Sequence, residues 1–72
     1  MKDRGRITVT ANGQKVEMDP GTRVGDFLAQ HRLEPRSVLV EINGAALLKS
    51  EFDTRVLIAE DRVEIIRVVA GG

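Results

Sequence analysis

The sequence contains no cysteine and a single histidine, His31. Without cysteine, disulfides, thiolate metal sites and thiol nucleophiles are excluded. One histidine is too few for a site in which several imidazoles bind a metal, and we expect no histidine-based catalytic triad. The sequence therefore predicts neither a metal site nor a nucleophilic side chain.

Aromatic residues, net charge and long apolar segments are also scarce. Phe27 and Phe52 are the only aromatic residues, and 11 basic side chains are balanced by 11 acidic ones. Nucleic-acid binding relies on clustered positive charge or stacked aromatic rings, so we expect no such partner. No apolar run approaches the roughly 20 residues of a membrane span, and the charged start Met1–Arg6 is not followed by an apolar signal segment. We therefore expect a cytoplasmic protein without a membrane partner.

The first part of the chain predicts a β-hairpin. Ile7–Ala11 alternates apolar and polar residues, which is typical of a strand buried on one face. Asn12-Gly13 follows and suits a type I′ turn, in which both central residues have positive φ. Val16 and Met18 then alternate with charged residues, as the second strand of the hairpin.

A short helix is predicted after the hairpin. Thr22 is expected to cap its first turn through the side-chain hydroxyl. Gly25 lowers the helix propensity, and Pro35 stops the helix before it is reached. The residues that recur at helical spacing on one face are Val24, Phe27, Leu28 and His31.

Two or three further strands are predicted in the second half. Val38–Ile42 alternates in the same way as the first strand, and Asn43-Gly44 provides a second turn. The following segment, 45–54, is ambiguous and is compatible with a short strand at Leu47-Leu48. The last strand, 62–69, is apolar on both faces, which indicates a central position in the sheet.

These elements predict one α+β domain. The helix has one apolar face and must bury it, so we expect a roll in which a mixed four- to five-stranded sheet packs on one helix. Residues 1–69 are expected to form this domain, and residues 70–72 a flexible tail. A chain of 72 residues with so few reactive groups is not expected to be an autonomous enzyme or to bind a cofactor.

The carboxylates and the histidine form no recognisable site. The aspartates, Asp61 among them, are scattered over predicted turns and caps, and we interpret them as solvated surface charge. No pair of them has the spacing expected for acid and base catalysis. His31 is expected at the rim of the buried helix face.

The last two residues, Gly71-Gly72, are the one candidate for a reactive site, because they stand at the end of a short segment after an apolar strand. Glycine lacks a Cβ atom, so its backbone can thread a narrow channel and its carboxyl carbon is unhindered. A carboxylate becomes a good electrophile only when ATP converts one of its oxygens into a leaving group. We therefore interpret Gly72 as the reacting residue of a protein cosubstrate, and Gly71 as the residue that permits threading.

Six segments together resemble one known family. They are Asn12-Gly13, Thr22–Leu28, Val38–Gly44, Lys49–Phe52, Arg62–Ile65 and Val69–Gly72. Across nearly the whole chain they are similar to the ubiquitin-like sulfur carriers of the ThiS/MoaD family, most closely to its ThiS members. The resemblance implies the β-grasp fold of these ubiquitin-like proteins.

The resemblance also implies a function, that of a sulfur carrier for the thiazole ring of thiamine. Gly72 would be adenylated by a ThiF-type enzyme that uses ATP, and then converted to a thiocarboxylate that donates sulfur to thiazole synthase, ThiG. A cysteine desulfurase or a persulfide protein would supply the sulfur. The carrier would be a cosubstrate of these enzymes and would bind no cofactor of its own.

Two segments depart from the family pattern. Glu60-Asp61-Arg62 stands where the family usually has Asp-Gly-Asp, so this turn is expected to differ. Leu47-Leu48-Lys49 stands where Val-Pro usually precedes the basic residue. MoaD-type carriers usually have prolines before the terminal glycines, and Arg67–Val69 does not fit that pattern. The alternatives are the same chemistry for molybdopterin, cysteine or a secondary metabolite, a protein-conjugating role, and a β-grasp interaction module with an inert tail.

One face of the sheet is predicted to bind the partner enzyme. If Val63 and Ile65 face the helix, alternation directs the intervening side chains of the last strand to the other side, where no second helix is predicted. An exposed apolar patch in a small protein usually marks a binding surface. The residues expected to contact the partner are Leu39, Ile66, Val68, Val69 and Ala70. In the alternative, the segment 47–58 folds over this face.

Overall fold

The computed structural model describes residues 5–68, which form a five-stranded sheet and one α-helix. The elements in chain order are β1 (Ile7–Ala11), β2 (Gln14–Met18), α1 (Val24–Gln30), a 3-10 turn (Pro35–Ser37), β3 (Val38–Ile42), β4 (Ala45–Leu47), a second 3-10 turn (Lys49–Glu51) and β5 (Arg62–Arg67). The tail expected at 70–72 lies outside the described residues.

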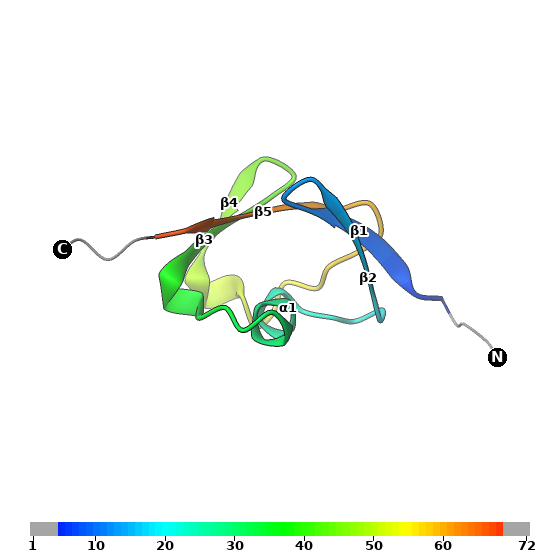
Figure 1. Ribbon diagram of the computed structural model, residues 1–72. Helices are drawn as coiled ribbons and strands as arrows, with labels where there is room; N and C mark the ends of the chain where they lie inside the picture. Colours follow the sequence, from blue (N-terminus) through cyan, green and yellow to red (C-terminus); the bar gives the residue numbers. More distant parts are fainter. Residues whose placement is uncertain (1–4, 69–72) are drawn as a thin grey trace.

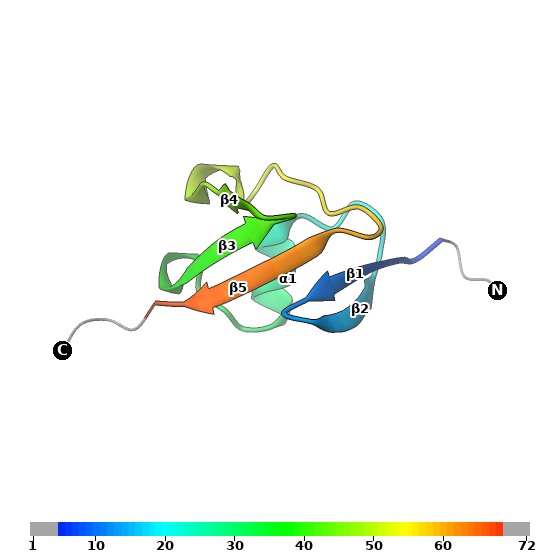
Figure 2. The ribbon, with the colours of Figure 1, turned by 90° about the horizontal axis from the view of Figure 1, so that it is seen from above.

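β5 occupies the centre of the sheet, whose strand order is β2-β1-β5-β3-β4. It pairs parallel with β1 and antiparallel with β3, while β2 and β4 form antiparallel edges. α1 packs across one face of the sheet (Figure 1), and in the view turned by 90° it lies behind the strands (Figure 2). The expected α+β roll of the β-grasp type, a mixed sheet on one helix, is confirmed.

Both Asn-Gly turns form as the sequence predicts. Asn12 and Gly13 have φ values of 49° and 85°, and Asn43 and Gly44 have values of 53° and 87°. Two consecutive residues with positive φ define the type I′ turn, whose twist matches that of the strands it joins. These turns fix the register of the β1–β2 and β3–β4 pairs.

The start of α1 differs from the prediction. Thr22 does not cap the helix: it is buried, and its hydroxyl donates a hydrogen bond to the carbonyl oxygen of Asp19, at 2.6 Å. Arg23 is the N-cap residue, and its backbone N–H donates to Oδ2 of Asp26, at 3.0 Å. The carboxylate of Asp26 therefore supports the first turn, where negative charge is favourable.

The end of α1 is closed by a Schellman motif. The backbone N–H of Arg32 donates to the carbonyl of Ala29 at 3.0 Å, and that of Leu33 donates to Leu28 at 2.8 Å. Arg32 has a φ of 59°, a conformation that favours glycine. The helix ends at Gln30, before Pro35, as expected.

The core lies between α1 and the inner face of the sheet. Its buried apolar residues are Val9, Met18, Val24, Phe27, Leu28, Val38, Val40, Ile42, Phe52, Leu57 and Val63. The alternation predicted for the strands is confirmed at Val9, Val63 and β3. His31 is exposed beside this core, with its ring centroid 4.4 Å from that of Phe27.

Gly25 is explained by a close approach of the backbone. Its N–H donates to the carbonyl oxygen of Phe52 at 2.8 Å, which ties the segment after β4 to the first turn of α1. A Cβ atom at this position would lie 3.3 Å from that oxygen and 2.6 Å from Oδ1 of Asp53. Glycine is required here despite its low helix propensity, because any side chain would push the Phe52 carbonyl and the Asp53 carboxylate away from the helix.

The interpretation of Asp61 as surface charge is wrong, because its side chain is only 3% exposed. Its carboxylate accepts hydrogen bonds from the Ile58 N–H and from the amide group of Asn43, both at 2.9 Å, and lies 3.5 Å from the guanidinium of Arg55. It thereby joins the turn before β5 to the β3–β4 turn. Glu60, just before it, has a φ of 74°, so this turn keeps a left-handed residue although it contains no glycine.

Candidate functional site

Three of the predicted contact residues come together on the outer face of the sheet, the face opposite α1. Leu39 of β3 and Ile66 of β5 are directly paired, and Val68 follows β5 at the same end. Their exposed fractions are 53%, 49% and 48%. The other predicted site residues, Val69, Ala70, Gly71 and Gly72, lie outside the described residues.

The backbone holds Val68 beside β3 although β5 itself ends at Arg67. The N–H of Val68 donates to the carbonyl oxygen of Ser37, at 2.8 Å. This bond continues the β3–β5 register by one residue pair beyond Val38–Arg67. The part of the chain that precedes the terminal residues is therefore anchored to the sheet up to Val68.

A fourth residue, Leu48, extends this apolar surface. The side chain of Leu48 is 65% exposed. The residue follows Leu47, the last residue of β4, which pairs with Val40. The β3–β4 pairing ends there, and its register, continued by one residue pair, places Leu48 opposite Leu39. The neighbouring Lys49 donates from Nζ to the carbonyl of Val38, at 3.1 Å. We call the surface formed by Leu39, Leu48, Ile66 and Val68 the outer patch. The sequence identified Leu48 only as part of a possible short strand.

The segment 47–58 does not cover the outer patch. Phe52 and Leu57 are buried in the core on the other side of the sheet. The N–H of Leu57 donates to the carbonyl of Thr22 at 2.9 Å, and Arg23 forms a β-bridge with Val56, so this segment is held beside the start of α1. The alternative in which it folds over the outer face is therefore wrong.

Negative charge lies next to the outer patch. Glu41 of β3 and Glu64 of β5 are directly opposite each other, one pair further along the same two strands than Val40 and Ile65. Like charges in such a pair weaken a sheet rather than stabilise it. The outer face therefore combines an apolar end, close to the end of β5, with an acidic pair.

The described residues offer little other chemistry. Among residues 5–68, no group of three or more histidine, aspartate or glutamate side chains could hold a metal ion. Within the same range, no helix is long and apolar enough to cross a membrane. The buried carboxylate of Asp61 has backbone, amide and guanidinium partners, which indicates a structural role.

The comparisons with known proteins identify the family of the chain and its fold. The family model described as "ThiS family" matches residues 6–72, including both terminal glycines. The comparison with curated proteins gave no match. A crystal structure of the thiamine biosynthesis protein ThiS from Geobacter metallireducens is 28% identical, with a TM-score of 0.76, over 92% of this chain and all of that one.

A solution structure of a thiamine biosynthesis protein from the same organism is also 28% identical, with a TM-score of 0.73. The match covers 92% of this chain and 88% of that one. Sulfur carriers of the matched family are substrates of other enzymes and have no catalytic activity of their own. With a family match over nearly its whole length and the same fold, the chain belongs to the ThiS family and is a sulfur-carrier-like protein of the thiamine biosynthesis type.

Proposed function

We propose that this chain carries sulfur for the thiazole ring of thiamine on the carboxyl group of Gly72. The observation that carries the proposal is the family match, which extends through Gly71-Gly72. An exposed apolar surface on the strand that leads toward these residues supports it. Residues 1–69 are the folded domain in this proposal, and residues 70–72 are the reactive tail.

The chemistry begins with the Gly72 carboxylate as a nucleophile. It attacks the α-phosphorus of ATP in the site of a ThiF-type enzyme, which gives an acyl adenylate and releases pyrophosphate. The terminal sulfur of a persulfide, on a cysteine desulfurase or a persulfide protein, then attacks the carbonyl carbon and displaces AMP, which gives an acyl disulfide. A thiol cleaves the S–S bond of this intermediate, which releases the thiocarboxylate and leaves a disulfide on the sulfur donor. Thiazole synthase, ThiG, accepts the sulfur from this thiocarboxylate. Gly71 keeps the approach to the reacting carbon free of side chains.

The outer patch is the docking surface for the activating enzyme in this proposal. Its four apolar side chains are exposed. Three of them belong to or adjoin the inner strands β3 and β5, and Leu48 adjoins the edge strand β4. Such a patch on a small protein usually marks an interface. Because Glu41 and Glu64 lie beside it, the complementary surface of the enzyme is expected to be apolar with basic residues at one side. Val69 and Ala70 then lead from this contact into the active site.

The length of the tail sets the depth of that active site. Four residues, from Val69 to Gly72, span at most about 14 Å when fully extended. We expect the enzyme to bind them in a slot of about this depth, in which a bulky side chain near the end would clash. A Gly71→Trp variant should therefore keep the fold and dock normally but fail to be adenylated.

The experiment is reconstitution of the full chain with a ThiF-type enzyme and ATP, with pyrophosphate release as the readout. Release with the wild type and none with Gly71→Trp, at equal binding affinity, supports the proposal. Normal adenylation of Gly71→Trp would contradict the threading step. Thiamine auxotrophy of a deletion strain then separates thiazole synthesis from molybdopterin, cysteine or other pathways, and absence of any adenylation would indicate an interaction module.

A further inference from the structure

The edge of β5 that faces β1 is covered only along the first part of the strand. The pairing of β1 with β5 ends at Ala11 and Val63. On the other side, β3 bonds to alternate residues of β5, as the bond from the Asn43 N–H to the Arg62 carbonyl, at 2.8 Å, indicates. By this alternation the backbone groups of Val63, Ile65 and Arg67 point toward the β1 side.

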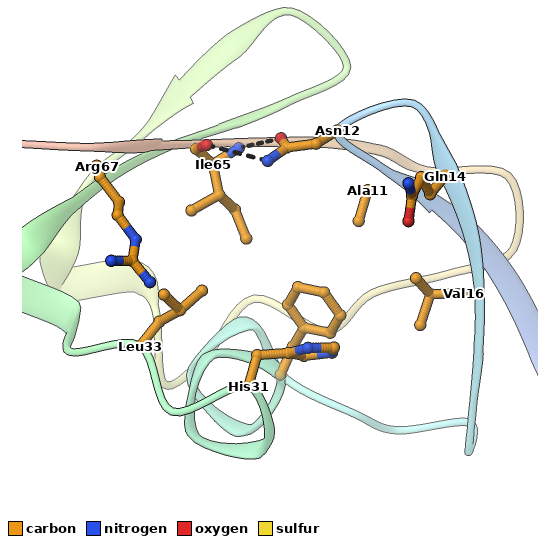
Figure 3. A pocket seen from close by; sticks show the side chains of 9 residues that line it. Ala11, Asn12, Gln14, Val16, His31, Leu33, Ile65 and Arg67 are labelled. Carbon is orange, nitrogen blue, oxygen red and sulfur yellow. Dashed lines mark hydrogen bonds between the residues drawn. The ribbon is translucent and has the colours of Figure 1, made fainter.

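The side chain of Asn12 forms hydrogen bonds with the next backbone groups on this edge, those of Ile65. Its side-chain Oδ1 accepts from the Ile65 N–H at 2.7 Å, and its Nδ2 donates to the Ile65 carbonyl at 3.2 Å, as the dashed lines in Figure 3 mark. The amide group thus takes the place of the next strand residue. Within residues 5–68, the first backbone N–H and carbonyl left open on this edge are those of Arg67. An open strand edge is a template for a further strand.

A pocket lies directly beneath this edge, between the sheet and the end of α1. Its volume is about 540 Å³, and its apolar walls are formed by Val16, Phe27, Leu33 and Ile65. Figure 3 shows Ile65 of β5 and Val16 of β2 pointing into this space, with Leu33 in the loop after α1 on its lower side. Arg67 extends from β5 toward Leu33. A second hollow of about 400 Å³ continues past Leu33 and Arg67 toward Val68. We call the two together the inner groove.

The charged residues of the inner groove are mainly basic. Arg67 lines both hollows, Arg32 lines the second, and Glu34 is the only carboxylate among their described lining residues. The carboxylate of Glu34 lies 3.9 Å from the guanidinium of Arg36, which partly compensates its charge. An occupant of this groove is therefore expected to carry negative charge.

We propose that the inner groove binds an extended segment of a partner protein in which an acidic residue adjoins an apolar one. The segment adds to the open edge of β5 and pairs with the backbone of Arg67, by strand addition. Its apolar side chain enters the pocket between Phe27, Leu33 and Ile65, and its carboxylate binds the guanidinium of Arg67. This site lies on the helix side of the sheet and shares only Val68 with the outer patch, and it is independent of the proposed sulfur chemistry.

The test is a titration of the ¹⁵N-labelled full chain with a capped peptide of alternating aspartate and valine, followed by NMR. We expect shifts at the amides of Asn12, Leu33 and Arg67, and slower hydrogen exchange of the Arg67 amide. Arg67→Glu should weaken binding by at least about tenfold, because it replaces an attractive charge by a repulsive one. Arg62→Glu is the matched control: Arg62 is an exposed arginine at the other end of β5 and should leave the affinity unchanged.

Several results would overturn the proposal. One is an unchanged hydrogen-exchange rate of the Arg67 amide at millimolar peptide. Another is an equal loss of peptide affinity in Arg67→Glu and Arg62→Glu. The third is that a peptide with lysine in place of aspartate binds as tightly as the original peptide. The same shifts on adding inorganic phosphate alone would indicate a simple anion site. The same shifts on raising the protein concentration without peptide would indicate a second copy of this chain.

Discussion

Replacing Ile66 by lysine tests whether the outer patch binds the activating enzyme. The side chain of Ile66 is about half exposed and pairs with Leu39 across β3 and β5. Full burial of an aliphatic side chain contributes about 1.5–3 kcal/mol, so covering the exposed half of Ile66 contributes about 0.8–1.5 kcal/mol to binding. Lysine removes this contribution and adds the desolvation of a charge. We expect the affinity for the ThiF-type enzyme to fall at least about tenfold, which corresponds to 1.4 kcal/mol.

The folded state should tolerate the same change. An exposed substitution that loses one cross-strand pair costs less than about 1 kcal/mol of unfolding free energy. In a domain of this size the melting temperature then falls by less than about 8 °C. Calorimetric titration with the enzyme and a thermal melt measure the two effects separately. Ile58→Lys is the matched control, because Ile58 is 60% exposed and lies in the loop before β5, away from the patch. Equal affinities of Ile66→Lys and the wild type, or equal losses in both variants, would refute the reasoning.

Three further changes test the fold and the charges around the patch. Phe27→Ala should cost about 3–5 kcal/mol of the roughly 5–15 kcal/mol available to a small domain, and an unchanged urea midpoint would contradict the packing of α1 on the sheet. Arg32→Gly should raise the unfolding free energy by about 0.5–1 kcal/mol, because it relieves a left-handed conformation; a lower melting temperature would be the contrary result. Glu64→Lys should stabilise the domain by about 0.2–1 kcal/mol, because the lysine faces Glu41 with an opposite charge. The same change should weaken binding to the enzyme. If stability and affinity change in the same direction, Glu41 and Glu64 do not have the proposed role.

The elements that the sequence predicted correctly are those encoded by local signals. Asn12-Gly13 and Asn43-Gly44 specify turns by their own backbone preferences, and the alternation in Val38–Ile42 specifies which side is buried. The exposure of Leu39 and Ile66 follows from the same alternation, since a chain with one helix covers only one face of the sheet.

The predictions were wrong where contacts between residues distant in the sequence determine the local structure. Thr22 has a good capping side chain, but its carbonyl accepts from the distant Leu57 N–H and its hydroxyl bonds to the Asp19 carbonyl. The N-cap position is left to Arg23, which forms a β-bridge with Val56. Asp61 looks like a turn residue, and only the approach of Asn43, 18 positions away, makes it a buried acceptor.

Leu48 belongs to the outer patch because of the register of β4 against β3. The sequence of segment 45–54 is ambiguous and does not specify this register. Asn12 is a further case. Its turn was predicted, but its side chain also extends the β1–β5 ladder by bonding to Ile65, 53 positions away. A single sequence carries no local signal for either contact.

The intact mass of the full chain, co-expressed with a ThiF-type enzyme and a sulfur donor, shows whether Gly72 carries sulfur. We expect the mass increase of one oxygen replaced by one sulfur, located in the peptide that ends at Gly72 and absent when Gly72 is deleted. The deleted variant should keep its fold, since the core cluster is formed by residues between Val9 and Val63. An unchanged mass of the wild type, or the same increase in the variant without Gly72, would show that Gly72 is not the sulfur-carrying residue.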